Sequence, residues 1–533
     1  MSNRVMRRLL AVAGLALMAA CAPKKPVAPA VPAGPTPVQR ATAAEALVRA
    51  GCFDCLVDAL REFEAARTAA SAAPATVEAA TAGAIRTAIL LELRQRELGL
   101  LDGGYLTRAR ELLNGREDLA AAFSVPLDVA RSTPPRFFDP RNLIDPAQMA
   151  AIRRAGQNHD AWRDALRAKA GEDPFAAYIW LTFACNIGAV RSLSPDDLAA
   201  TVAAVGPAPL LSYKTAMCPG TKDVPPKQSA IDVDTLKALR AGDPRFVEID
   251  YTLGNSLVFS GRIDEASALI GQAYKWHPKW PSALMSLAGL AVTGEEYDHA
   301  LVYYDGLLEL VPGHPEAMLG RVKMLGFVGQ NEEAIRAVDE MLQERWNRGE
   351  AYYWRAWNNM QLARNDQAWE DVQAAEKLWL KSDVLKLAGM IAYRRKEVDV
   401  ARQKFEAGHK MNADDCELGH YLGLVAAEQG RWQQAADVFP PNVDCLQHYQ
   451  QDQRAEIGFI QGSSATAERK ARQIARREKL IQEAERMIAT SWYNAAVAFY
   501  NLSRPADARS YAQKVVDDEQ FGERAKEILT RLK

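Results

Sequence analysis

The sequence predicts an all-α protein built mainly from stacked helical hairpins. One small residue recurs at nearly constant spacing, with intervals of 34, 34, 34, 33 and 34 residues: Ala266, Ala300, Ala334, Ala368, Ala401 and Ala435. That period is typical of a repeated helix–turn–helix unit. Alanine is abundant, and few segments alternate apolar and polar residues as strands do. The chain has 533 residues, too many for one hydrophobic core.

The first twenty residues have the pattern of an export signal. Arg4, Arg7 and Arg8 precede an apolar run over residues 9–17, which is too short to span a bilayer as a mature helix. The end of this segment, Ala19-Ala20-Cys21, resembles a bacterial lipobox. The resemblance implies that residues 1–20 are a signal peptide and that Cys21 carries a lipid. The alternative is an ordinary signal peptide cleaved nearby, with Cys21 incidental.

The same resemblance implies a location. Ala22 follows the cysteine where an aspartate would indicate the inner membrane, so we expect the outer membrane, facing the periplasm. Residues 21–40 are rich in proline and alanine, with six prolines between 22 and 38. A proline-rich segment is a semi-rigid spacer of about 3.1 Å per residue. We therefore expect a tether between the lipid and the folded part.

Residues 41–240 are expected to form an irregular α-helical region. Helices are predicted over residues 41–50, 52–67, 76–100, 105–113 and 146–170. Two more should begin at Pro174 and Pro195, because Asp173 and Ser194 are suitable N-caps before a proline at the first helical position. Proline-rich loops are expected around residues 132–140 and over residues 206–228.

Residues 243–440 should hold the regular array, about six repeats beginning at Asp243-Pro244. Three stretches carry its motif: Leu253-Gly254…Gly261…Ala266…Ala273…Pro278, Leu287-Ala288…Tyr297…Ala300…Tyr304…Pro312 and Leu422-Gly423…Trp432…Ala435…Phe439. These stretches resemble tetratricopeptide repeats, and the chain as a whole resembles a bacterial tetratricopeptide-repeat lipoprotein. The copy at residues 315–348 departs, with Trp346 in place of proline. The resemblance implies a right-handed superhelix with a concave groove.

Pro440 and Pro441 are predicted to end the last helix of the array. Residues 441–533 should be C-terminal helices, including a charged helix over residues 463–489. The usual meaning of such a run is a solvated face, and the alternative is a basic surface for anionic lipid or an acidic partner. Trp492 and Ala508 fit a degenerate last repeat that caps the stack.

Six cysteines remain when Cys21 is set aside. Cys416 and Cys445 should lie at adjoining ends of one antiparallel hairpin, within the reach of a disulfide. Cys185 and Cys218 have a similar relation. The Cys52-Phe53-Asp54-Cys55 stretch can be a local structural disulfide, two buried thiols or a redox motif at a helix start.

Catalytic signatures are missing from the sequence. It contains no His-Glu-x-x-His, no Gly-x-Ser-x-Gly and no phosphate-binding Gly-x-x-x-x-Gly-Lys-Ser/Thr. His409, His420 and His448 are not spaced by one helical turn, so we expect no metal site. Because the catalytic signatures are missing as well, we expect no cofactor and no enzyme activity. A thioredoxin-like motif should follow a strand, whereas helices flank Cys52 and Cys55. The net charge of −2 gives no reason to expect nucleic acid.

The resemblance also indicates where a partner would bind, because repeats of this type bind through the first helix of each hairpin. The matching positions are Tyr251, Asn255, Lys323, Tyr353, Trp357, Met360, Lys386, Met390 and Tyr393. Aromatic residues beside cations suit an extended peptide or an acidic C-terminus. Trp354 should face the interior of its hairpin, and packing is also an open alternative for Tyr353 and Trp357.

These observations favour a lipid-anchored periplasmic scaffold that binds a protein partner without covalent chemistry. The resemblance implies a role in envelope assembly, secretion or surface-polymer export. One alternative is a solute- or polymer-binding carrier that encloses its ligand in the groove. The other is a thiol–disulfide redox protein that acts through Cys52 and Cys55.

Overall fold

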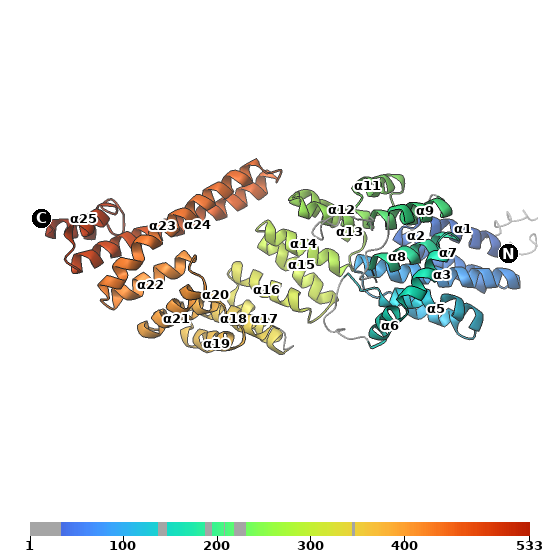
Figure 1. Cartoon of the computed structure of the whole chain (residues 1–533), viewed down its shortest axis with the longest axis horizontal. Helices are drawn as coiled ribbons and strands as arrows, with labels where there is room; N and C mark the ends of the chain where they lie inside the picture. The colour runs from blue at the N-terminus through green and yellow to red at the C-terminus, as the bar shows by residue number, and fades with distance from the viewer. Residues whose placement is uncertain are drawn as a thin grey trace, which may run out of the picture.

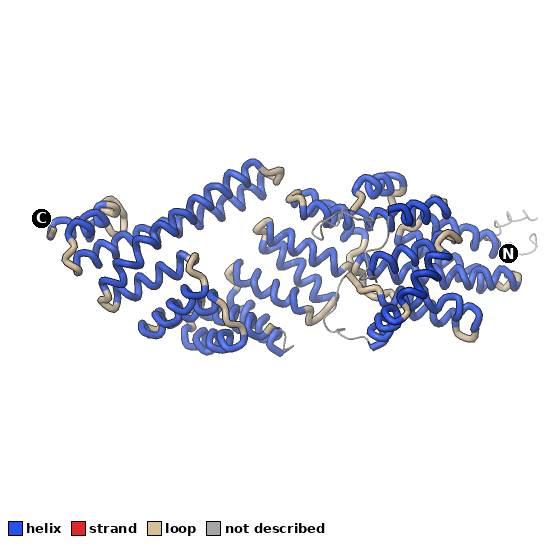
Figure 2. Tube along the Cα trace, viewed as in Figure 1, coloured by secondary structure: helices blue, strands red, loops and turns tan. Residues whose placement is uncertain are grey.

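The computed structural model describes residues 34–136, 146–186, 195–206, 208–217, 231–343 and 347–532. Within these residues all regular structure is helical (Figure 2), as the sequence predicts. No helix among them is both long enough and apolar enough to cross a membrane. The predicted signal peptide, Cys21 and most of the tether lie outside the described residues, as do Cys218 and Trp346.

Eleven helices in the described residues make up the N-terminal part. They are α1 (Pro37–Ala50), α2 (Phe53–Thr68), α3 (Pro74–Leu98), α4 (Tyr105–Leu113), α5 (Glu117–Ser132), α6 (Pro146–Gln157), α7 (His159–Lys169), α8 (Pro174–Asn186), α9 (Pro195–Val205), α10 (Pro209–Met217) and α11 (Val233–Gly242).

Helices α5 and α10 are not among the helices predicted from the sequence, and α10 lies within the loop expected over residues 206–228. Helix α5 contains Pro126 and still continues to Ser132, since Phe123 and Val129 are buried on its inner face. Helix α10 starts with Pro209, where a proline costs no hydrogen bond, and buries Leu210. In both segments apolar burial outweighs the proline signal.

A buried ion pair joins the N-terminal part to the array. The Arg94 side chain on α3 is fully buried, donates to Glu248 at 2.8 Å and lies over the Tyr213 ring at 3.6 Å. Glu248 is the first residue of α12 and also accepts from the Phe53 amide at 2.7 Å. One carboxylate therefore connects α2, α3 and the first repeat helix.

The array begins at Glu248 rather than at Asp243-Pro244, because residues 243–246 form a turn in which the Phe246 amide donates to the Asp243 carbonyl. Its helices are α12 (Glu248–Phe259), α13 (Ile263–Trp276), α14 (Pro281–Thr293), α15 (Tyr297–Leu310), α16 (Pro315–Phe327), α17 (Asn331–Gln343), α18 (Arg348–Gln361), α19 (Asn365–Leu378), α20 (Ser382–Arg394), α21 (Val398–Met411) and α22 (Cys416–Glu428).

The 34-residue period has the expected cause, because the periodic small residues are where the two helices of a hairpin touch. All six alanines of the pattern are completely buried. A Cβ atom added to Gly254 would lie 2.5 Å from Ile270, and one added to Gly423 would lie 2.4 Å from Phe439. The array is a solenoid of the tetratricopeptide type.

The turn inside each hairpin repeats as well. One residue there has a left-handed backbone in six successive hairpins: Gly261, Glu295, Gly329, Ala363, Lys396 and Gly430. Three of the six are not glycine, and a left-handed backbone at such a residue costs about 1–2 kcal/mol. The packing of the two helices must therefore impose this turn despite that cost.

The last helix of the array does not end at Pro440-Pro441. Helix α23 (Trp432–Gly462) runs through both prolines. Each proline removes one backbone hydrogen bond, but Phe439 and Val443 are buried on either side of the pair. The Cys416–Cys445 disulfide also holds this part of the helix to α22.

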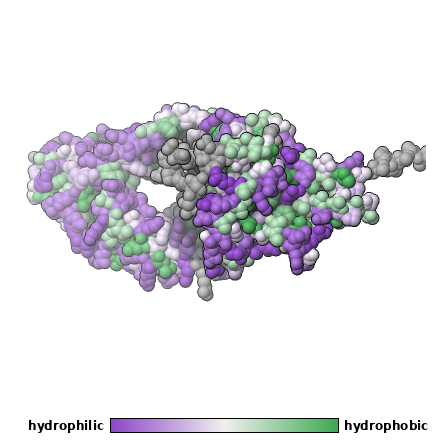
Figure 3. Space-filling view, turned by 45° about the vertical axis from the view of Figure 1, so that its right-hand side comes forward, coloured by the Kyte–Doolittle hydropathy of each residue, from purple (hydrophilic) through white to green (hydrophobic). Residues whose placement is uncertain are grey.

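Helix α24 (Ala467–Asn501) packs along α23, and α25 (Pro505–Gln513) and α26 (Gly522–Arg531) follow it. We call residues 450–481, the distal halves of α23 and α24 with their turn, the arm. The arm runs back from α22 toward α12 and α13 (Figure 1). An opening passes through this side of the molecule, and the described residues on its border are mainly hydrophilic (Figure 3).

Candidate functional site

A continuous row of aromatic rings crosses three helices of the array. Tyr297, the first residue of α15, lies 5.2 Å from Phe327, the last residue of α16, between ring centroids. Phe327 lies 5.7 Å from Trp354 on α18, which in turn lies 5.8 Å from Trp357 and 5.4 Å from Tyr353. We call these five residues the aromatic row. They bring together side chains from three successive hairpins.

Phe327 is the most accessible member of the row, with 48% of its surface exposed. The other four residues are partly buried. The sequence analysis did not include Phe327. The only signal for it was its position, since it stands at the C-terminal end of a first helix, beside residues already under consideration.

Trp354 and Trp357 show why the row is rigid. Trp354 packs against a buried cluster that includes Val322 and Met341, as expected for a residue facing its hairpin's interior. The Trp357 ring lies against α16, and a Cβ atom added to Gly326 would come within 3.1 Å of it. The two indoles therefore contribute to packing and also border the row.

The row begins beside the arm. Burial raises the pKa of Tyr297, the nearby Glu295 raises it further, and Arg476 and Arg477 on α24 act in the opposite direction. Both arginines are thus close enough to Tyr297 to influence its phenol. One end of the row accordingly lies between the array and the arm.

The two predicted cations, Lys323 and Lys386, are engaged within the array. Lys323 Nζ lies 2.8 Å from Glu350, on the next first helix. Lys386 Nζ lies 3.0 Å from both Asp415 and Glu417, at the start of α22. Burial alone would lower the pKa of Lys386, but the two carboxylates hold it above its ordinary value. These lysines brace neighbouring repeats and bring little unpaired charge to a partner.

Tyr353 and Tyr393 are phenols held in the neutral form. Burial raises the pKa of Tyr353 to about 12, and Asp383 adds to the effect. Burial also raises the pKa of Tyr393 to about 12, together with a hydrogen bond to Glu428. Met390, between them in sequence, is partly buried and packs against two apolar clusters.

Two other predicted residues, Tyr251 and Met360, belong to the interior, and a third, Asn255, is partly buried with its amide engaged. Tyr251 is 2% exposed and its ring lies 4.5 Å from that of Trp280. Met360 is also 2% exposed. Asn255 donates to the Tyr251 carbonyl at 2.8 Å and accepts from Ser286 at 3.1 Å. A surface partner would not reach Tyr251 or Met360 in this structure, so the candidate surface consists of the aromatic row with Met390 and Tyr393.

The arm reaches the array through a polar contact that we call the clasp. Asp264, at the start of α13, accepts from the Thr466 amide and from Arg469 Nε, both at 2.5 Å. Glu296 pairs with Arg469 at 3.5 Å and with Arg472. The charged helix is therefore neither simply solvated nor free for another molecule at this end.

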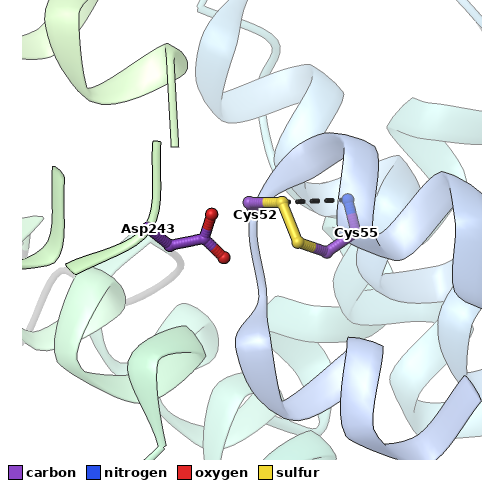
Figure 4. Close-up of side chains that lie close together, drawn as sticks. All are labelled: Cys52, Cys55 and Asp243. Carbon is purple, nitrogen blue, oxygen red and sulfur yellow. Dashed lines mark hydrogen bonds between the residues drawn. A yellow bond between two sulfur atoms is a disulfide. The ribbon is translucent and has the colours of Figure 1, made fainter. Parts of the chain in front are cut away.

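Cys52 and Cys55 form a disulfide, with the Asp243 carboxylate nearby (Figure 4). The disulfide, one of the three alternatives for this pair, is present in the structure. Cys52 is the N-cap of α2, and its sulfur accepts from the Cys55 amide at 3.0 Å. Both cysteines are completely buried, whereas thiol–disulfide exchange requires access to the sulfur atoms.

The same three residues form a group with metal-ligand geometry, their donor atoms lying within 4.8 Å of one another. Metal ligation requires free thiolates. The disulfide therefore occupies both sulfur atoms in this state, and Asp243 is held by Arg245 at 2.7 Å.

The Cys416–Cys445 disulfide is confirmed, with Cα atoms 5.6 Å apart. Cys185 is disulfide-bonded. Its predicted partner Cys218 lies outside the described residues, so that pairing stays a prediction. His420, one of the three histidines considered above, is 6% exposed and pairs with Ser491 on α24 at 3.1 Å.

Comparison with known proteins gives a limited picture. No family model matches the chain. Cellulose synthase operon protein C of Pseudomonas fluorescens is 33% identical over 82 residues, which are 15% of this chain and 6% of that protein's length.

Solved structures of the repeat type cover parts of the chain. A tetratricopeptide repeat protein from Parabacteroides merdae matches at 17% identity over 48% of this chain and 91% of its own, with a TM-score of 0.34. PilF of Pseudomonas aeruginosa matches at 13% identity over 54% and 97%, with a TM-score of 0.27. Both scores are below 0.5, so neither likeness bears on function.

Proposed function

We propose that this chain is a lipid-anchored scaffold of the bacterial cell envelope that binds a protein partner along the aromatic row. The observation that carries the proposal is the row itself. It is a rigid set of rings with Phe327 exposed at its centre, on a solenoid of helical hairpins. Large aromatic side chains held by packing are the usual anchors of protein interfaces, since little conformational entropy is lost when they bind.

The chemistry of the row suggests an extended, mainly apolar peptide. The phenols of Tyr353 and Tyr393 remain neutral at physiological pH, and that of Tyr353 can donate a hydrogen bond to a backbone carbonyl, whereas that of Tyr393 is already bonded to Glu428. Lys323 and Lys386 are already paired with carboxylates, which argues against an acidic C-terminus as the main determinant. Affinity should therefore depend weakly on salt.

The anchor and the pathway belong to the same proposal. Lipidation at Cys21 and a tether that ends before α1 begins at Pro37 would hold the solenoid near the outer membrane, on its periplasmic side. Roles in envelope assembly, secretion or surface-polymer export all suit a tethered scaffold without chemistry of its own.

The test uses the most exposed ring of the row. Phe327→Ala removes an exposed side chain, so folding should be preserved, whereas Tyr353 and Trp357 are packed and would confuse binding with stability. The matched control is Val302→Ala, because Val302 is 64% exposed on α15 and takes no part in the row. Lipidated protein is used to capture partners from envelope membranes, and the bound proteins are identified by mass spectrometry.

We expect one protein to be retained by the wild type and by Val302→Ala and to be lost or strongly reduced with Phe327→Ala. Equal recovery with both variants would remove the row from the proposal. Circular dichroism should show the same helix content in all three proteins.

A second candidate is a carrier that encloses a polymer between the arm and the array. Two observations favour it, namely the opening beside the arm (Figure 3) and the short similarity to cellulose synthase operon protein C. Fluorescence of the tryptophans in the row, titrated with soluble oligosaccharides, separates the two proposals. A saturable change that Phe327→Ala abolishes would favour the carrier.

A further inference from the structure

We propose that the arm is a releasable strap, which closes the array into a ring through the clasp and opens to let a chain enter or leave sideways. This inference concerns a movement of the protein itself. It does not depend on what the aromatic row binds.

The base of the arm is firmly attached. The Cys416–Cys445 disulfide joins α22 to α23, and His420 pairs with Ser491 on α24. Val443 and Ile488 belong to a buried apolar cluster that α23 and α24 share. Movement at this end would require unfolding, so the base provides a fixed hinge point.

The tip of the arm is attached in a different way. Its contacts with the array are hydrogen bonds and ion pairs, and no apolar cluster within the described residues joins the two. In addition to the Asp264 and Glu296 contacts, Gln473 donates to the Thr293 carbonyl at 3.1 Å, and Arg477 lies 3.7 Å from Glu295. The clasp therefore combines a few polar contacts at the end of a long hairpin.

The end of α14 leaves room for the Arg469 side chain of the clasp. Arg469 is 4% exposed and donates to the carbonyl of Leu290 at 3.4 Å, at the C-terminal end of α14, where a cation also suits the helix dipole. A Cβ atom added to Gly294 would lie 1.9 Å from Arg469 Nη1. Gly294 has φ −82° and ψ 1°, a conformation open to any residue. A side chain at position 294 would therefore force the Arg469 guanidinium to shift from its place in the clasp, whereas the backbone there would accept any residue.

The chemistry of the clasp makes it reversible. Ion pairs between partly exposed groups are weak, and salt screens them, whereas apolar contacts strengthen or persist in salt. The side chains of Arg472 and Arg477 are 34% and 28% exposed, and those of their partners Glu296 and Glu295 are 19% and 14% exposed, so all four keep some access to solvent at the edge of the contact. High salt should thus open the tip while the base stays closed.

An opening strap has a clear consequence for binding. A closed ring can be entered only by a free chain end, whereas an open one admits the middle of a long chain. Release of the clasp would let the scaffold engage a polymer or an assembled protein that presents no free end near it.

The experiment measures the distance across the clasp by single-molecule fluorescence energy transfer in the full-length mature protein. Azidophenylalanine replaces Phe459 near the arm's tip and Val302 on the array, which are 75% and 64% exposed. Dyes are attached through the azides, so the cysteines are not touched. Two matched pairs are compared: Gly294→Ala with Gly289→Ala, and Arg469→Ala with Arg454→Ala.

The controls change the same residue types without touching the clasp. A Cβ atom on Gly289 would meet nothing within 4 Å. Arg454 pairs with Glu485 inside the hairpin. We expect a high-efficiency population at low salt and a several-fold larger low-efficiency population at about 1 M NaCl, where the Debye length is about 3 Å.

Gly294→Ala and Arg469→Ala should show the low-efficiency population already at low salt, and both controls should match the wild type. One unchanged population at every salt concentration, with clasp variants equal to their controls, would overturn the proposal. Loss of helix content in the clasp variants alone would overturn it too, since the arm would then be part of the folding core. No partner is present, so the result is independent of the proposed binding function.

Discussion

The packing of Gly423 against Phe439 gives a prediction whose sign depends on one neighbouring ring. Alanine in place of glycine inside a helix ordinarily stabilises a protein by about 0.5–1 kcal/mol. At Gly423 the added Cβ atom would lie 2.4 Å from Phe439 Cε1 and 2.7 Å from two further ring atoms. Phe439 is completely buried, so its ring has no space into which it can turn.

Overpacking of this kind costs about 1–3 kcal/mol. Gly423→Ala should therefore lower the free energy of unfolding by up to about 2 kcal/mol, once the helix-propensity gain of about 1 kcal/mol is subtracted. Phe439→Ala alone should cost about 3–5 kcal/mol. In the Phe439→Ala background the clash is gone, so Gly423→Ala should become neutral or stabilising by about 0.5–1 kcal/mol.

Urea unfolding followed by circular dichroism measures all four proteins of this cycle. A long repeat array need not unfold in one step. We therefore compare the transition that reports on the disulfide-linked C-terminal hairpins, and only between variants whose unfolding free energy depends on urea concentration with the same slope. Gly458→Ala is the control for propensity alone, since Gly458 lies on α23 in the same C-terminal part and its Cβ atom would meet nothing within 4 Å. If Gly423→Ala stabilised the wild type as much as Gly458→Ala does, the assigned packing of this hairpin would be refuted.

Three further predictions concern buried polar groups and the hinge. Burial lowers the pKa of His420 from 6.5 to about 4. Its contribution to the free energy of unfolding is therefore complete above pH 6.5, and about 3 kcal/mol is lost as the pH falls toward 4. Denaturant melts across this pH range should show the loss, and His420→Gln should make the unfolding free energy less dependent on pH. Replacing Cys416 and Cys445 with serine opens a loop with a sequence separation of 29, and the unfolding free energy should fall by about 3–4 kcal/mol. The difference between reduced and non-reduced samples in the same melts should become smaller, and what remains comes from the Cys52–Cys55 and Cys185 disulfides. Arg94→Met leaves Glu248 buried without its cation and should lower the free energy of unfolding by about 3–5 kcal/mol. Adding Glu248→Gln should restore most of this loss in thermal melts. If it restored none, the unpaired Glu248 carboxylate would not be the cause of the loss.

The periodic part of the fold could be predicted because its cause is local. The contact between two helices of one hairpin requires a small residue every 34 positions, and such a requirement is visible in the sequence at Ala266 and Gly254. The Cys416–Cys445 disulfide followed from the same geometry, since its cysteines stand at adjoining ends of one hairpin. Both depend on residues fewer than about 35 positions apart.

The clasp could not be predicted, because Arg469 and Asp264 are more than 200 residues apart and neither charge has a pattern around it. A charged helix looks the same in sequence whether it is solvated or paired. The curvature of the array and the length of α23 together decide the contact, and the length of α23 was misjudged at Pro440. Phe327 was missed for a related reason, since its neighbours in the row come from three hairpins.

The central claim is that a partner binds along the aromatic row, and photo-crosslinking in living cells tests it most directly. Benzoylphenylalanine is placed at Phe327 or, as a control, at Val302, and lysates are analysed after irradiation. We expect one discrete crosslinked product from position 327 and none from position 302. A product of the same size from position 302, with none from position 327, would show that the partner binds elsewhere on the solenoid.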